Sequence, residues 1–92
     1  MLLTGALIVQ LEKLPGADRA GALLALLEFC RVCGEPHLES DLEFRKIGRH
    51  EFECVAGSRW RLIVCDMPDC WRAWFIGDRS DIGRLLRARL IL

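Results

Sequence analysis

Apolar positions in the first third of the chain predict a strand and then a helix. Residues 5–11, GALIVQL, form a short aliphatic and β-branched run that predicts a first strand, ended by Pro15-Gly16. From Asp18, which can act as the N-cap, to about Cys33, apolar residues recur at helical intervals. Further apolar positions widen this stripe, so we expect the helix to be covered on most sides. Its stripe consists of Leu23, Leu24, Leu27 and Cys30.

From Glu51 onward the apolar period is two, which predicts strands. In residues 51–56 apolar side chains alternate with glutamates. Residues 59–65 are largely apolar on both faces, which indicates a central strand. Residues 66–69, DMPD, form a hairpin loop that leads to another strand at residues 70–76.

The remaining segments complete a small α+β domain. A last helix begins at Ser80 or Asp81, with an apolar stripe that includes Ile82 and Leu86. Residues 37–47 are polar and mixed, and both a short helix and an irregular strand fit them. The predicted order is strand, helix, this undecided segment, a meander of three strands and a helix. It corresponds to a single α+β domain over residues 1–92, with a small antiparallel sheet packed on the N-terminal helix.

Composition supports a globular domain and gives an indication of its partners. The chain has 92 residues, of which 52% are hydrophobic and 28% charged, which excludes a disordered chain. So small a body cannot bury all of this apolar surface, so we expect a partner surface or a homodimer. No run has the features of a signal peptide or the length of a membrane span. With five cysteines, an odd number, we expect reduced thiols in the cytoplasm.

The net charge is zero, but the two parts of the chain differ in sign. Residues 1–56 carry six lysines and arginines against nine acidic residues, whereas residues 57–92 carry seven arginines against four aspartates. The positive part predicts a phosphate-binding surface. The alternative is ordinary surface charge in a chain that prefers arginine, since it has only two lysines.

The cysteines allow three interpretations. The pairs Cys30-x-x-Cys33 and Cys65/Cys70 could supply four thiolate ligands to zinc. However, the second pair is separated by four residues, more than in a standard knuckle, and the first lies at the end of an apolar helix where cysteine often packs as a small hydrophobe. We therefore favour buried thiols, with zinc and a redox CxxC as alternatives, and we expect no metal or cofactor.

Basic residues of the second half carry the candidate chemistry. Cleavage of RNA by its own 2′-hydroxyl requires fixed positive charge and a general base. Arg61 lies within a predicted strand and Arg79 follows the last one, so neighbouring strands could bring both onto one concave surface. His50 is the candidate base because imidazole titrates near neutral pH, although a lone histidine in a turn is usually a surface residue. The predicted nucleic-acid contacts are Arg45, Lys46, Arg61, Arg72 and Arg79.

These segments resemble the C-terminal half of RelE/ParE-type toxins of bacterial toxin–antitoxin modules. The similar region runs from Phe52 to Leu86, FECVAGSRWRLIVCDMPDCWRAWFIGDRSDIGRLL, preceded by RKIG at residues 45–48. Its parts are WRLIV at residues 60–64, like the aromatic-Arg-aliphatic strand of that family, and FIGDR at residues 75–79, like its apolar-Gly-x-Arg ending. The resemblance implies a RelE-like fold, an antitoxin partner that covers the apolar surface, and a ribosome and mRNA or a host protein as target.

The resemblance also implies roles for two arginines. Arg61 matches the strand arginine that contacts the scissile phosphate region in the ribonuclease members, and Arg79 matches their second arginine. The chain departs from that pattern at residues 51–56, where Glu51 and Glu53 stand in place of positive charge, and it has no tyrosine. Two hypotheses therefore stay open. The first is a ribosome-dependent mRNA endoribonuclease with His50 as base, and the second is a non-enzymatic module, either a ParE-like target binder or a phage- or plasmid-encoded inhibitor of a host protein.

Overall fold

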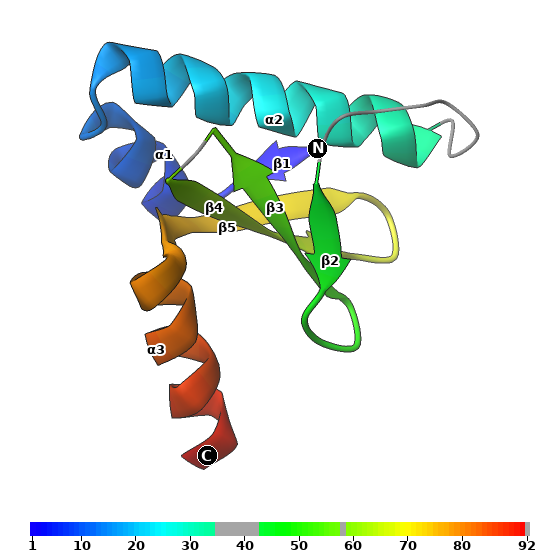
Figure 1. Cartoon of the computed structure of the whole chain (residues 1–92). Coiled ribbons are helices and arrows are strands. Elements are labelled where there is room, and N and C mark those ends of the chain that lie inside the picture. The colour runs from blue at the N-terminus through cyan, green and yellow to red at the C-terminus, as the bar shows by residue number, and fades with distance from the viewer. Residues whose placement is uncertain (35–42, 58, 92) are drawn as a thin grey trace.

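The computed structural model describes residues 1–34, 43–57 and 59–91, and its helices lie on both sides of one mixed sheet (Figure 1). The strands are β1 (Leu2–Leu3), β2 (Phe44–Lys46), β3 (Glu51–Ala56), β4 (Trp60–Asp66) and β5 (Trp71–Asp78). The helices are α1 (Gly5–Glu12), α2 (Gly16–Gly34) and α3 (Arg79–Ile91). Among these described elements no helix is long and apolar enough to cross a membrane.

The sheet confirms the predicted α+β class and the central strand, and it adds one parallel pair. Its strand order is β1-β5-β4-β3-β2, so β4 lies in the middle. Strands β2 to β5 form consecutive antiparallel pairs, whereas β1 pairs parallel to β5 through Leu2↔Arg72 and Leu3↔Ala73. The prediction of an antiparallel sheet therefore holds for β2 to β5, whereas the parallel strand β1 makes the whole sheet mixed. In the undecided segment, β2 is a strand, and residues 37–42 lie outside the described part.

The prediction of a first strand at residues 5–11 is wrong, because this run is helix α1. The side chain of Thr4 acts as the N-cap and accepts a hydrogen bond from the backbone N–H of Leu7 at 3.2 Å. Leu7 and Leu11, one helical turn apart, are buried, while Ile8 and Val9 are exposed. The run is thus amphipathic with the helical period, and the strand that joins the sheet is the preceding pair Leu2–Leu3.

Helix α2 begins at Gly16, ahead of the predicted cap, and buries a different face from the predicted stripe. Of that stripe, Leu24 and Leu27 are 66% and 67% exposed. The small side chains on the buried face let the helix backbone lie close to the sheet. That face consists of Ala22, Ala25, Leu26, Phe29 and Val32.

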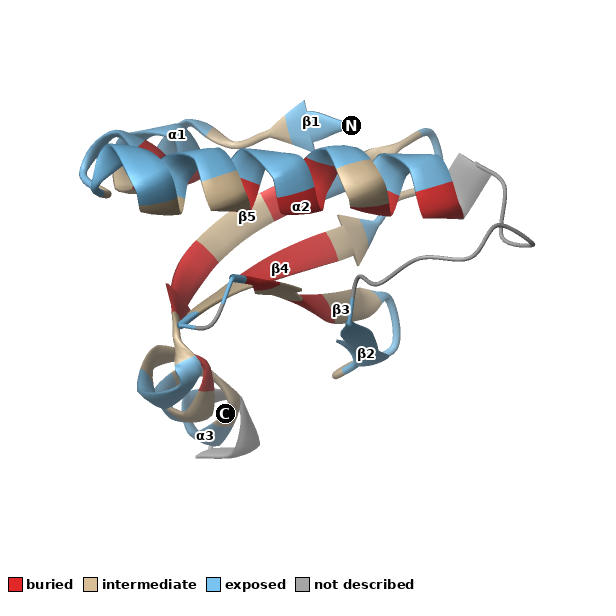
Figure 2. Cartoon of the chain, turned by 45° about the horizontal axis from the view of Figure 1, so that its top comes forward, coloured by how far each residue is buried: buried red, intermediate tan, exposed pale blue. Residues whose placement is uncertain are grey.

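The main core lies between the sheet and the helices α1 and α2 (Figure 2). Phe29 is its largest fully buried side chain. The ring centroid of Phe29 lies 4.9 Å from that of Trp71 and 5.6 Å from that of Phe44, both in edge-to-face geometry. This cluster fixes β2 and β5 beneath the end of α2. Helix α3 and a depression next to α3 lie on the other face of the sheet.

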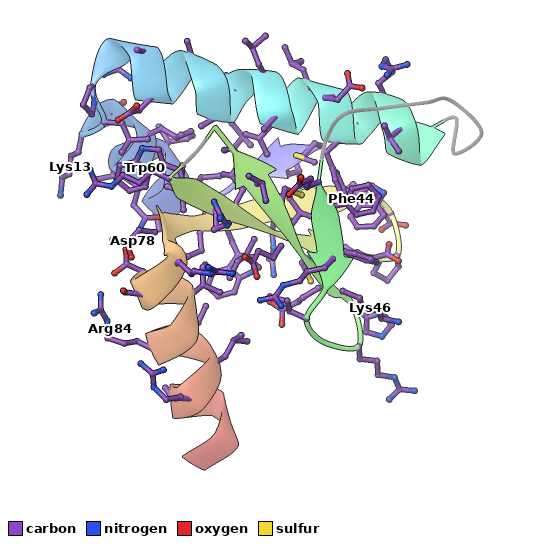
Figure 3. All side chains as sticks on the ribbon, in the orientation of Figure 1. Lys13, Phe44, Lys46, Trp60, Asp78 and Arg84 are labelled. Carbon is purple, nitrogen blue, oxygen red and sulfur yellow. The ribbon has the colours of Figure 1, made fainter. Side chains whose placement is uncertain are left out.

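Helix α3 starts directly where β5 ends, and its N-cap is Asp78, not the predicted Ser80 or Asp81. The backbone N–H of Asp81 donates to the carboxylate of Asp78 at 2.9 Å, and the backbone N–H of Asp78 donates to the carboxylate of Asp81 at 2.9 Å. This reciprocal pair is a capping box. Figure 3 shows Asp78 at this junction. Ile82 of α3 is buried, as is Ile63 on β4.

Candidate anion-binding site

A depression of about 270 Å³ lies on the sheet face opposite α1 and α2. Four of its charged residues come from separate elements: Arg45 from β2, Glu53 from β3, Arg61 from β4 and Arg79 from the first position of α3. Glu43, Phe44 and Val55 complete the lining. Three guanidinium groups and two carboxylates give the described lining a net formal charge of +1.

The register of the strands brings Arg45, Glu53 and Arg61 together. Arg45 and Glu53 are direct partners across β2 and β3, and Arg61 pairs with Val55, so it lies diagonally from Glu53 on the same face. The Glu53 Oε2 accepts from Arg45 Nε at 3.0 Å and lies 2.9 Å from its Nη2. The Glu53 Oε1 lies 3.5 Å from Arg61 Nε. Arg61 Nη1 also donates to the carbonyl of Trp60 at 3.1 Å.

Arg79 enters the depression through the geometry of the β5–α3 junction. Because Asp78 and Asp81 cap the helix reciprocally, the direction in which α3 leaves the sheet is fixed at the residue before Arg79. The hydrogen bond from the Asp81 N–H holds the pKa of the Asp78 carboxyl below its ordinary value of 3.8. Within the described ranges, the Arg79 side chain has no ion-pair partner, so its charge is available to a ligand.

The other predicted site residues lie elsewhere. Lys46 pairs with Phe52, on the face of the sheet opposite Arg45, and is exposed on β2 (Figure 3). Arg72 pairs with Cys65, four residues along β4 from Arg61, which is about 13 Å along the strand. It lines a separate depression with Glu51 and Trp74.

His50 is exposed just before β3 and does not line the arginine depression. The backbone carbonyl of His50 accepts a hydrogen bond from the backbone N–H of Asp66 at 2.7 Å. His50 lines a third depression together with Met67 and Pro68. Val55, the partner of Arg61, lies five residues further along β3, which is about 17 Å for an extended chain. The predicted role of His50 as general base stays a prediction.

The cysteines considered for zinc are spread over the molecule. Cys30 is exposed on α2, whereas Cys65 and Cys70 are half-buried at the two ends of the β4–β5 loop. The sulfur of Cys65 lies 3.6 Å from that of Met67. The side chain of Cys33 falls outside the described part. In the described ranges no three His, Cys, Asp or Glu side chains form a group that could hold a metal ion.

A second feature is an exposed apolar surface on the outside of the N-terminal elements. A shallow apolar groove of about 410 Å³ lies between the β1 end and α2. Leu23, Leu24 and Leu27 are among the exposed large apolar residues of α2, and Leu2 is 60% exposed on the edge strand β1. Exposed apolar residues beside an apolar groove on a small protein are typical of a protein interface.

Among comparisons with known proteins, a match comes from solved structures and concerns the fold. No family model matches the chain, and no curated protein matches its sequence. Among solved structures, a chain of the RelB–RelE antitoxin–toxin complex from Methanococcus jannaschii superposes with a TM-score of 0.70 at 18% identity. The match covers 92% of this chain and 98% of the other. The fold is that of RelE-like toxins.

On this RelE-like fold, the charged residue of the depression that matters most and was not predicted as a site residue is Glu53. The alternation in residues 51–56 placed Glu53 on the polar face of its strand, yet it is buried. The signal that could have found it is the facing arginine Arg45, whose partnership depends on the register of β2. That register could not be read from the polar segment before β3.

Proposed function

We propose that the chain is the toxin of a bacterial toxin–antitoxin pair and that its arginine depression binds an RNA phosphate. The observation that carries this proposal is the meeting of Arg61 and Arg79 in one depression on a RelE-like fold. Fixed guanidinium groups bind phosphate oxygens through paired N–H donors and stabilise the extra negative charge that develops during cleavage. The proposed reaction is ribosome-dependent cleavage of mRNA by its own 2′-hydroxyl, in the cytoplasm.

The proposed roles are tested by induced expression in a bacterial host with mapping of cellular RNA ends. We expect growth arrest and new mRNA ends with the wild type, and loss of both with Arg61→Ala or Arg79→Ala. Arg87→Ala is the matched control, because it removes the same charge from an exposed position of α3 outside the depression. Full toxicity of both depression variants would show that the assigned roles are wrong.

His50 needs its own test because it lies apart from the arginines. If it is the general base, His50→Gln abolishes the new mRNA ends while the variant stays folded. Unchanged cleavage by this variant contradicts the role and requires a base from the ribosome or from the RNA.

We further propose that a cognate antitoxin covers the apolar surface of α2 and β1. The crystal structure with the similar fold is of an antitoxin–toxin complex, and the apolar side chains of Leu24 and Leu27 are both exposed here. The occupant is expected to be a segment with an apolar face. Leu24→Glu/Leu27→Glu should abolish rescue by the antitoxin, whereas Ala17→Glu, which adds a charge in the first turn of the same helix, should leave rescue intact.

A second candidate function is a binder of a host protein without catalysis. It is favoured by the composition of the depression, whose described lining includes two carboxylates and no histidine. This candidate predicts growth arrest without new RNA ends, and a stable complex with one host protein. RNA mapping during the same expression experiment therefore separates the two functions.

A further inference from the structure

We infer that Glu53 is a positioning residue of the depression, which holds the guanidinium groups of Arg45 and Arg61 in place before a phosphate arrives. The inference rests on the proposed phosphate-binding role of this site. It concerns a residue whose charge should by itself oppose that role. The sign of its effect on anion binding can therefore decide between positioning and simple repulsion.

The carboxylate of Glu53 is buried and therefore needs charged or hydrogen-bonded partners. Its side chain is only 7% exposed. A carboxylate removed from water to this degree is unfavourable unless its oxygens have charged or hydrogen-bonded partners. Both oxygens have one, since Oε2 contacts Arg45 and Oε1 faces Arg61.

The two arginines that pair with Glu53 are more exposed to solvent than Glu53 itself, as expected for a site formed before its ligand binds. The side chain of Arg61 is 16% exposed and that of Arg45 is 69% exposed, so Glu53 lies deeper in the sheet face than either. Each guanidinium group has five N–H donors in a rigid plane, and Glu53 engages only the Nε and Nη2 of Arg45 and the Nε side of Arg61. Donors on the more exposed parts of both groups stay available to a ligand.

Positioning has a physical benefit for anion binding. A free arginine side chain loses rotamer freedom when a ligand orders it, and this loss weakens the observed affinity. Two arginines that a buried carboxylate and a backbone carbonyl already order do not lose it again. Glu53 is attached to β3 between β2 and β4, so the sheet itself sets the spacing of the two groups.

The opposing effect is the repulsion between Glu53 and a phosphate. If Glu53 were only a counter-charge, its neutralisation would raise the net charge of the described lining from +1 to +2 and tighten anion binding. If it positions the arginines, Glu53→Gln weakens binding, because one amide oxygen cannot hold two guanidinium groups and the amide NH₂ meets a like donor. The two explanations predict opposite signs for the same variant.

The experiment is a titration with inorganic phosphate, followed through the arginine Nε–H signals in NMR spectra. We expect Glu53→Gln to raise the half-saturating phosphate concentration about tenfold, a loss typical of misplaced charge-assisted contacts. Glu51→Gln is the matched control. It removes the same charge from the same strand, at a residue that lines a different depression, and should change the value by less than about twofold. Unchanged or tighter binding by folded Glu53→Gln overturns the inference.

A second measurement on the wild type covers the case in which Glu53→Gln does not fold. ¹⁵N relaxation of the phosphate-free protein should show ordered Nε–H groups for Arg45 and Arg61 and a more mobile one for Arg79. A mobile Arg61 Nε–H in the free protein overturns the inference.

The titration also separates this inference from the proposed function. Phosphate binding that Glu53→Gln weakens, with no RNA cleavage by the wild type, supports the role of Glu53 and refutes the ribonuclease. Failure of the wild type to bind phosphate overturns both.

Discussion

Gly77 lies where β5 meets α3, and Gly77→Ala should destabilise the protein through the helix cap. An ideal Cβ at this position lies 2.6 Å from the Cβ of Asp81, 2.9 Å from its Oδ2 and 3.0 Å from the ring of Phe75. Carbon atoms pack best about 3.5–4.0 Å apart, so Asp81 or the strand must move by about 1 Å. Asp81 cannot move in this way without disturbing its hydrogen bond from the Asp78 N–H.

The magnitude follows from the two contacts that are disturbed. Loss of a capping interaction costs about 1 kcal/mol, and overpacking typically costs about 1–3 kcal/mol. The lower entropy of unfolded alanine offsets about 0.5 kcal/mol of this. We therefore expect the free energy of unfolding to fall by about 1.5–3.5 kcal/mol, which a domain of this size can tolerate without unfolding.

Gly83→Ala provides a matched control of opposite sign. Gly83 lies inside α3, and the nearest atoms to a Cβ there belong to the far end of the flexible Arg87 side chain, the closest of them at 3.3 Å. Alanine is favoured over glycine within a helix by about 0.5–1 kcal/mol, so this variant should be more stable than the wild type.

Urea unfolding followed by tryptophan fluorescence measures both effects. With a slope of about 1 kcal/mol/M, the midpoint should fall by about 1.5–3.5 M for Gly77→Ala and rise by about 0.5–1 M for Gly83→Ala. An unchanged or higher midpoint for Gly77→Ala would refute the argument. If the site is built as described, Gly77→Ala also weakens phosphate binding, because a shift of about 1 Å at the helix start displaces Arg79.

Substitutions at three further residues test other parts of the structure. Phe29→Ala should lower the free energy of unfolding by about 3–5 kcal/mol in the same urea assay, because this buried ring packs against three others; a loss below about 1 kcal/mol would contradict that packing. Arg19 donates to the carbonyls of Leu11, Glu12 and Leu14, so Arg19→Ala should cost about 1 kcal/mol, and Arg19→Lys, which lacks the planar fork, should not restore the loss. Because the folded pKa of Asp78 is lowered, its carboxylate stabilises the fold above about pH 4, and this contribution is lost as the pH falls through the lowered pKa. Asp78→Asn should thus lower the urea midpoint at pH 7 and flatten its decrease in acid, and parallel curves would refute the assignment.

The second half of the fold could be predicted because its signals are local. Alternation in β3 and the apolar faces of β4 determine the strand period and the central place of β4, and the loop after β4 joins neighbours in the sheet. Strand parity also placed Arg61 on a definite face. The juxtaposition with Arg79 required only that β5 lie beside β4.

The first half of the fold was harder to predict from the sequence, because apolar residues occur around most of each helix. In residues 5–11 the β-branched residues favour a strand, and only the cap at Thr4 and the one-turn spacing of Leu7 and Leu11 indicate a helix. In α2, a stripe through Leu23 and Leu27 and one through Ala22 and Phe29 are equally regular. Tertiary packing selects the second, since alanines fit close to the sheet and the ring of Phe29 fills the core.

The pairing of β1 with β5 has a consequence for the order of folding. Leu2 pairs with Arg72, so this contact closes a loop of 70 residues, whereas the β4–β5 hairpin closes over a few. Closure entropy grows with loop length, and contacts distant in sequence form late. The antiparallel strands β2 to β5 should therefore assemble first. Until β1 pairs with β5, the backbone N–H and C=O groups on the outer edge of β5 have no strand partner. During that interval the newly folded chain is open to strand exchange with another copy, so refolding yield should decline as protein concentration rises.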